Sequence, residues 1–246
     1  MKHLRWQLIF AVSLIVLSAI VYISQILIFQ RPQDTVFYIF QDFAFVPISV
    51  LVVTLIIDQL LRIREKRAML KKMNMVIGAF FSEVGTDLLK SFPDFDQHYD
   101  QIRGNLIITG DWSEQEFSNV KKRLKNYDYN IESRKGDLED LKSFLTGKRD
   151  FLLSLLENPN LLEHESFTDL LWAVTHLTEE LACRKDLRRL PKTDYAHLSG
   201  DIKRAYVLLV AEWVSYMKHL KDNYPYLFSL AVRINPFNPD ASPEVR

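Results

Sequence analysis

The sequence predicts an all-α protein in which a two-helix transmembrane hairpin is followed by a cytoplasmic helical bundle. Two long apolar segments lie close together near the N-terminus, and a run of basic residues follows the second. Apolar residues then recur at spacings of three and four, as on one face of a helix. We therefore expect a hairpin at 1–61, a basic juxtamembrane amphipathic helix at 62–92, a cytoplasmic helical domain at 93–234 and a flexible tail at 235–246.

The first predicted span covers about residues 8–29. From Leu8 to Phe29 the chain carries no charged side chain, and about 20 helical residues cross a hydrocarbon core that is ~30 Å thick. Lys2 and Arg5 precede this segment, as in a signal peptide. The apolar stretch is longer than the usual signal-peptide core, however, and no Ala-x-Ala cleavage site follows it. We therefore expect an uncleaved anchor.

The second predicted span covers about residues 43–61. The aromatic stretch 36–40 leads into it and suits the outer headgroup zone. Asp58 lies near the inner end, one helical turn before Arg62, so we expect an interfacial ion pair there rather than a functional acid in the membrane. The connector between the spans is too short for a re-entrant selectivity filter.

Basic residues around the spans predict the orientation of the hairpin. The connector holds only Arg31 and Asp34 as charged residues, whereas the segment after the second span holds one acid and six basic residues, which we call the basic collar. Since Lys and Arg near a span are retained in the cytoplasm, we expect a multi-pass protein of the cell (inner) membrane with both termini cytoplasmic. The collar should also attract anionic lipid headgroups. It consists of Arg62, Arg64, Lys66, Arg67, Lys71 and Lys72.

An apolar stripe follows the second span at helical spacing, and its side chains need cover. They can be buried by the C-terminal helices of the same chain, or by a second copy in a homo-oligomer. The stripe consists of Met69, Met73, Val76, Phe80 and Val84.

Helix start signals divide the cytoplasmic part. Ser113 with Glu116, and Ser166 with Asp169, have the spacing of capping boxes. We expect one helix to begin near Asp137 and to end at residues 158–160, and another to cover 196–222.

Composition excludes several classes of function. The 31 basic residues balance the 31 acidic ones, and no recognition-helix motif, zinc-finger spacing or glycine-rich phosphate loop occurs, so we expect no nucleic-acid partner and no cofactor. A lone cysteine, Cys183, rules out a disulfide within the chain and suits a reducing compartment. We expect Cys183 to be a core residue rather than a nucleophile, and we identify no catalytic residue.

The candidate metal ligands are His164, His176 and Glu180. His176 and Glu180 share a helical face at i, i+4, yet helical di-metal centres use Glu-x-x-His on two helices, and here the order is reversed and does not recur. The alternative is that these groups are capping charges and a solvated acidic face. A basic run after this helix either complements its dipole or binds an anion; it comprises Arg184, Lys185, Arg188, Arg189 and Lys192.

Two segments resemble a family of uncharacterised prokaryotic two-span membrane proteins with a helical cytoplasmic domain. They are Leu-Leu-Glu-Asn-Pro-Asn-Leu-Leu-Glu-His-Glu-Ser-Phe-Thr at residues 155–168 and Tyr-Pro-Tyr-Leu-Phe-Ser-Leu-Ala-Val-Arg at residues 224–233. The resemblance implies a prokaryotic cell membrane and no particular activity.

The function expected from these patterns is that of a membrane-anchored cytoplasmic helical module, which binds a protein partner or transmits a signal and has no catalytic activity. One alternative is a subunit of an oligomeric channel or transporter, since a two-span hairpin forms a pore only as several copies. A second alternative is a metal-dependent enzyme with a site in the helical bundle.

Overall fold

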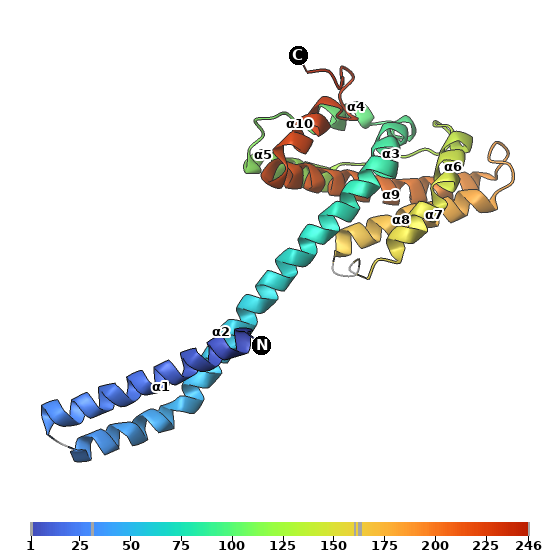
Figure 1. Cartoon of the computed structure of the whole chain (residues 1–246). Coiled ribbons are helices and arrows are strands. Elements are labelled where there is room, and N and C mark those ends of the chain that lie inside the picture. The colour runs from blue at the N-terminus through green and yellow to red at the C-terminus, as the bar shows by residue number, and fades with distance from the viewer. Residues whose placement is uncertain (1, 31, 160, 162–163, 246) are drawn as a thin grey trace. The chain divides into compact units, whose positions relative to one another are not determined.

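The computed structural model describes residues 2–30, 32–159, 161 and 164–245 (Figure 1). All regular elements among these residues are helices, and the one extended pairing is an isolated antiparallel bridge between Asp96 and Ile131. The all-α prediction is therefore confirmed. The chain divides into two compact units, an N-terminal unit, Met1–Lys66, and a C-terminal unit, Arg67–Arg246.

The N-terminal unit contains α1, Lys2–Phe29, and the first part of α2, Pro32–Phe80. Gln30 ends α1 in the left-handed conformation, with φ of 52° and an N–H that donates to the Ile26 carbonyl at 3.0 Å. A left-handed residue reverses the chain at a helix end. Tyr22 of α1 donates to the Asp42 carboxylate of α2 at 2.7 Å, which ties the two helices together.

One helical segment of the described chain, Gln33–Lys66, is long and apolar enough to cross a membrane. A second apolar stretch, Val12–Ile28, is shorter and falls within the first predicted span. The structure thus has one candidate span by length and composition where the sequence predicts two.

The C-terminal unit is built around the long helix α9, Lys192–Asn223, which packs against α3, α5, α8 and α10 (Figure 1). Short turns and helices lead from the end of α2 toward these elements. In chain order the remaining elements are η1 (Phe81–Gly85), α3 (Thr86–Ser91), η2 (Phe92–Phe95), α4 (Tyr99–Arg103), η3 (Gly104–Leu106), α5 (Glu114–Asn126), α6 (Leu138–Gly147), α7 (Arg149–Leu156), α8 (Glu165–Cys183) and, after α9, α10 (Pro225–Arg233).

Two of the predicted helix starts are confirmed. Ser113 and Glu116 form a reciprocal capping box at α5, and the Asp137 carboxylate accepts backbone N–H bonds at the start of α6. The helix expected from Asp137 to residues 158–160 is divided at Lys148 into α6 and α7. Gly147 precedes this break, and glycine weakens a helix interior.

The predicted capping box of Ser166 and Asp169 is wrong. α8 begins two residues earlier than that box requires, with His164 as its N-cap, whose ring accepts from the Phe167 N–H. The Ser166 hydroxyl instead donates to the buried Glu212 carboxylate at 2.9 Å. Ser166 therefore bonds to Glu212, a charged acceptor far away in the sequence, rather than taking part in a capping box with Asp169.

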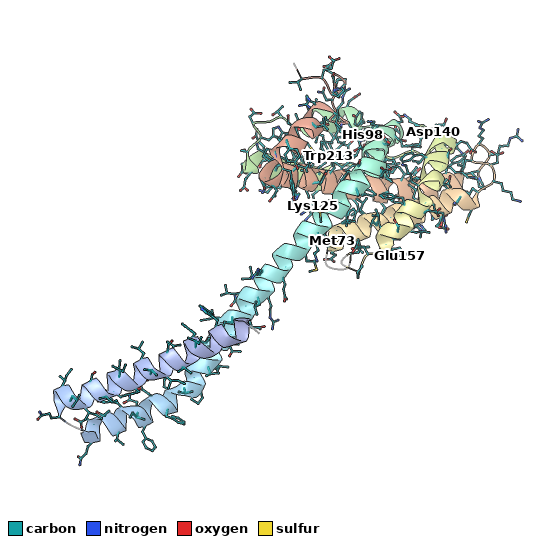
Figure 2. All side chains as sticks on the ribbon, in the orientation of Figure 1. Met73, His98, Lys125, Asp140, Glu157 and Trp213 are labelled. Carbon is teal, nitrogen blue, oxygen red and sulfur yellow. The ribbon has the colours of Figure 1, made fainter. Side chains whose placement is uncertain are left out.

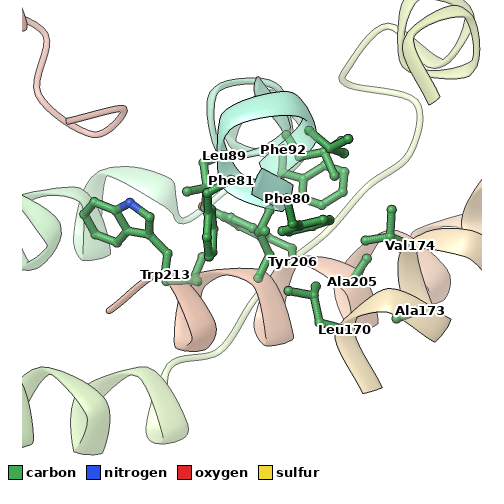
Figure 3. Close-up of a cluster of buried hydrophobic side chains, with 14 of the residues drawn as sticks. Phe80, Phe81, Leu89, Phe92, Leu170, Ala173, Val174, Ala205, Tyr206 and Trp213 are labelled. Carbon is green, nitrogen blue, oxygen red and sulfur yellow. The ribbon is translucent and has the colours of Figure 1, made fainter. Parts of the chain in front are cut away.

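Aromatic rings form the centre of the core (Figure 3). The rings of Phe80 and Phe92 are fully buried. Phe80 packs edge to face on Phe167 with ring centroids 5.5 Å apart, and Phe92 packs in the same way on Tyr206 with centroids 5.6 Å apart. Such edge-to-face pairs are favoured by the ring quadrupoles. Because Phe80 belongs to α2 and Phe167 to α8, these contacts join the end of α2 to the helical bundle.

Most of the apolar stripe belongs to this core or packs against it, while Met69 is only partly buried. Met73, Phe80 and Val84 are almost completely buried within the C-terminal unit. Residues 67–92 are therefore part of a compact unit rather than a separate juxtamembrane helix at 62–92, because their apolar face is covered by the chain's own helices.

The terminal segment 235–246 also differs from the expected flexible tail. Asn235 and Phe237 are buried, and the centroid of the Phe237 ring lies 4.9 Å from that of Trp213. Trp213 belongs to α9 and is labelled in Figure 2. The Asn235 amide donates to the Leu106 carbonyl at 2.9 Å. The Asn235 and Phe237 side chains hold the start of the segment against the domain. The sequence contains no sign of this, because a segment rich in proline has no helical pattern of apolar residues.

A π-helical turn, η1, connects α2 to α3 at a crowded point. The Thr86 N–H and hydroxyl both donate to the Phe81 carbonyl, the hydroxyl at 2.7 Å. A Cβ added to Gly85 would lie 2.6 Å from Phe81 Cδ1 and 2.9 Å from Phe80 Cε1. Glycine is needed here because both rings are buried and cannot move aside.

Replacing Gly85 with Ala should therefore destabilise the C-terminal unit by about 1–3 kcal/mol, as expected for overpacking. Gly200 is a matched control, since it lies inside α9 and an added Cβ would meet nothing within 4 Å. Gly200→Ala should stabilise by about 0.5–1 kcal/mol through helix propensity. Thermal unfolding of the full-length chain, followed by tryptophan fluorescence, measures both, and shifts of the same sign would contradict the crowding at Gly85.

Candidate functional site

The structure separates the three predicted metal-ligand candidates. His164 caps the N-terminus of α8, with its Nε2 atom 3.9 Å from the buried carboxylate of Glu212. His176 and Glu180 lie three to four turns further along the same helix, ~18 Å or more away at ~1.5 Å per residue. His164 therefore belongs to a capping arrangement and does not share a site with the other two.

His176 and Glu180 meet two residues of α9 that the sequence reasoning missed, His197 and Asp201. His176 Nε2 lies 3.6 Å from Asp201 Oδ1, and His197 Nε2 lies 3.2 Å from Asp201 Oδ2. Glu180 Oε1 is 3.8 Å from His176 Nε2, while its Oε2 is 3.5 Å from His197 Nε2. We call these four residues the His–Asp cluster.

Helix geometry explains how the cluster forms. His176 and Glu180 are four residues apart on α8, and His197 and Asp201 are four residues apart on α9. Residues at i and i+4 share one helical face. The contacts pair the earlier residue of α8 with the later residue of α9, so the two helices run antiparallel here. The signal was available in the sequence as a second His-x-x-x-acid spacing.

Two arginines fix the carboxylates of the cluster. Arg184 donates to Glu180 Oε2 at 2.7 Å and to both Asp194 oxygens, at 2.6 and 2.9 Å. Its hydrogen bonds lower the pKa of the Glu180 carboxyl and that of the Asp194 carboxyl. Arg204 donates to Asp201 Oδ1 at 2.9 Å. The arginines therefore hold the carboxylates of Glu180, Asp194 and Asp201 in defined orientations.

Asp201 is the most buried acid of the cluster, with a side chain that is 3% exposed. Its Oδ1 atom accepts from Arg204, whereas its Oδ2 atom has no hydrogen-bond partner among the described residues. His197 Nε2 lies 3.2 Å from Oδ2, within the distance of a hydrogen bond, yet the two atoms do not form one. This buried oxygen is therefore left unsatisfied despite the close approach of the ring.

A pocket of about 460 Å³ adjoins the cluster on the outer side of α8 and α9. His176 of the cluster and Arg204, which donates to Asp201, both line the pocket, together with the exposed Trp172. The pocket lining is completed by Asp169, Ala173 and Leu208. The pocket therefore meets the His–Asp cluster at His176, whereas Asp201 is buried behind it.

The structure gives two members of the basic run at the end of α8 different surroundings. Arg184 is occupied by Glu180 and Asp194, and its side chain is 15% exposed. Arg188 lies apart from it, on the wall of a different pocket that Arg134 and Lys135 also line. The expectation that Cys183 is a core residue is wrong, because its side chain is exposed at the last position of α8.

The basic collar is exposed where the structure describes its side chains, namely at Arg62, Arg64, Lys66 and Lys72. The side chains of Arg67 and Lys71 lie outside the described set. The expected ion pair of Asp58 and Arg62 is present at 2.7 Å.

Replacing Arg184 with Gln should lower stability by about 1–2 kcal/mol at neutral pH, because it removes charge-assisted bonds to two acids. Both acids have a folded-state pKa below the unfolded value, so their stabilising contribution is complete above about pH 5 and is lost as the pH falls further. The variant should thus lose less stability than the natural chain on acidification. Thermal unfolding from pH 7 to 3 tests this, with the exposed Lys185→Gln as control; parallel acid slopes would contradict it.

Comparison with known proteins places this fold in a family. The chain is 50% identical over 238 residues to "Uncharacterized protein MJ1433" of the archaeon Methanocaldococcus jannaschii, covering 97% of this chain and 96% of that protein. Residues 69–233 match the family described as "Uncharacterized protein MJ1433, C-terminal helical domain", and residues 1–61 match "MJ1433, N-terminal helical domain". No solved structure matches the chain. The chain thus belongs to the MJ1433 family, whose members combine an N-terminal and a C-terminal helical domain.

Proposed function

We propose that the protein is a membrane-anchored helical module, with α1 and the first part of α2 as a transmembrane hairpin and the C-terminal unit as a cytoplasmic domain that binds a protein partner or transmits a signal. The observation that carries this proposal is the exposure of apolar side chains in the N-terminal unit. Phe40, Leu51 and Ile56 are 75%, 59% and 53% exposed. Soluble domains rarely expose contiguous apolar surface of this extent, whereas lipid covers it.

Polar groups of the N-terminal unit support burial in lipid. The Ser13 hydroxyl donates to the Phe10 carbonyl at 2.7 Å, and the Ser49 hydroxyl to the Phe45 carbonyl at 3.2 Å. Each hydroxyl is therefore satisfied within its own helix, as a side chain in hydrocarbon requires. α1 has 28 residues, which gives ~42 Å of helix, enough to cross the ~30 Å core.

The collar supports the cytoplasmic orientation of the C-terminal unit. Its four described side chains are exposed, and clustered Lys and Arg gain roughly 1 kcal/mol each near an anionic membrane surface. Asp58 is paired with Arg62 and so carries no isolated charge into the bilayer. Both termini are then cytoplasmic.

The C-terminal unit offers its own surface for a partner. Met73, Phe80 and Val84 of the stripe are buried inside the chain, which favours cover by its own helices over cover by a second copy. This supports the module over the oligomeric-pore alternative. What remains exposed on the module includes Trp172 of α8 and Tyr226 of α10, which are 59% and 72% exposed. Exposed aromatic side chains of this kind are common at protein contacts.

The anchor predicts behaviour in cell fractionation. The full-length chain should stay in the membrane pellet after an alkaline carbonate wash and dissolve only with detergent, because two spans are retained by the hydrophobic effect rather than by charge. A peripheral protein is the matched control. Recovery of most of the chain in the carbonate supernatant would contradict the proposal.

The collar predicts the orientation of the hairpin. A reporter inserted at Gln33 should read as external, and fusions at either terminus should read as cytoplasmic. Exchanging the six collar residues for Gln should make the orientation mixed, because retention of positive charge no longer favours one side. The same exchange at Lys121, Lys122 and Lys125 of α5, far from the spans in sequence, is the control. A cytoplasmic signal at Gln33 in the natural chain would overturn the topology.

A further inference from the structure

We propose that His176, His197 and Asp201 bind a single divalent first-row transition-metal ion, with an open coordination position facing the Trp172 pocket. This inference goes beyond the proposed anchoring function and does not depend on it. It also replaces the sequence-based candidate set, in which His164 is too distant from His176 to contribute.

The first argument is the convergence of the donor atoms. One ligand atom from each of His176, His197 and Asp201 lies within 4.8 Å of the others. His176 Nε2 lies 3.6 Å from Asp201 Oδ1, and His197 Nε2 lies 3.2 Å from Asp201 Oδ2. Two ligands of one tetrahedral zinc ion stand about 3.3 Å apart, because each bond is about 2.0–2.1 Å long. The three side chains therefore converge on one point, and a shift of their flexible ends would bring the three donor atoms to this spacing.

The second argument is the unsatisfied oxygen of Asp201. A carboxylate that is buried from water is costly unless its oxygens are paired. Arg204 satisfies Oδ1 at 2.9 Å, whereas Oδ2 has no hydrogen-bond partner although it lies 3.2 Å from His197 Nε2. A cation between Oδ2 and the rings would satisfy this oxygen. Arg204 then acts as the outer partner that orients a ligating carboxylate.

The third argument concerns the alternative, in which one histidine is protonated and simply pairs with Asp201. An imidazolium would direct its N–H at the carboxylate, and at 3.2 Å it would form a strong hydrogen bond. The His197 contact forms no such bond, because Oδ2 has no hydrogen-bond partner, and the His176 nitrogen is 3.6 Å from Oδ1. Two imidazole nitrogens beside one buried carboxylate, without a hydrogen bond from either, suit ligands of one ion.

The donor set indicates the class of metal. Two imidazole nitrogens and one carboxylate oxygen suit zinc, iron(II), cobalt and related ions, and a set of three leaves positions open for water or another ligand. His176 and His197 are 46% and 50% exposed, so these positions face solvent. Glu180, 3.8 Å from His176, is held by Arg184 beside the open side and can orient a bound water.

The scaffold favours a preformed site. All three ligands come from the interiors of α8 and α9, which make the most extensive contact in the C-terminal unit, rather than from loops. Ligands on packed helices hold their geometry better than ligands on loops. The local charge also suits a cation. The carboxylates of Glu180, Asp194 and Asp201 outnumber the two guanidinium groups that pair with them, those of Arg184 and Arg204.

The test is a metal titration of the full-length chain in detergent, without a histidine tag and with Cys183→Ser, so that no exposed thiol competes. After EDTA treatment and dialysis, Co²⁺ serves as a visible probe and Zn²⁺ as its competitor. We expect one Co²⁺ per chain, a ligand-field absorption band, and displacement by Zn²⁺. Asp201→Asn, which keeps the side-chain shape, and His197→Ala should each weaken binding about tenfold or more.

His98→Gln is the matched control, because His98 lies outside the cluster, with Nδ1 3.3 Å from the Asp128 carbonyl. It should leave the titration unchanged. The melting temperature is a second measurement, made with His176→Gln because the side chain of His176 is half-exposed and its replacement should disturb folding little. Zn²⁺ should raise the melting temperature of the natural chain but not that of His176→Gln. Absence of saturable binding, or equal binding by the cluster variants and His98→Gln, would overturn the metal site without affecting the membrane anchor.

Discussion

The antiparallel packing of α8 against α9 is the interaction on which the rest of the C-terminal unit depends. The inner faces of the two helices bury Phe167, Leu170 and Tyr206, and the end of α2 inserts Phe80 against them. The outer faces of the same helices bring His176 and His197 to one carboxylate. A single packing register therefore determines both the aromatic core and the geometry of the His–Asp cluster. A shift of one residue along either helix would turn its face by about 100° and separate both sets.

The chain distributes its apolar residues between two environments. In the C-terminal unit, Met73, Phe80 and Val84 are buried by protein, whereas in the N-terminal unit Phe40 and Leu51 remain exposed. The change occurs near the collar, within a single helix, α2. The sequence pattern distinguishes these two environments in part. Apolar residues spaced three or four apart indicate a helix with one face covered by protein, whereas a helix that is apolar on all sides indicates lipid. The match of residues 1–61 and 69–233 to two separate helical domains of one family agrees with this division.

The cluster also shows how polar groups are distributed in a small helical domain. Glu212 and Asp201 are both buried acids of α9. Glu212 is satisfied by the Ser166 hydroxyl at 2.9 Å, so it anchors the start of α8 and has a structural role. Asp201 keeps one oxygen unpaired. Buried polar atoms without partners are uncommon and costly, which is why this difference separates a capping arrangement from a candidate ligand site.

The sequence by itself determined the helical class, the capping of α5 and α6, the pairing of Asp58 with Arg62 and the presence of a long apolar helix, because these depend on spacing within a few residues or on composition. It could not determine that His164 and His176 lie apart, that Ser166 turns to Glu212, that Cys183 is exposed or that Phe237 returns to α9. Those outcomes depend on contacts between residues far apart in the chain, and side-chain periodicity gives the face of each helix but not its neighbour. His197 and Asp201 show the limit most clearly. Their spacing was visible on α9, yet only the register of α8 on α9 decided that they meet His176.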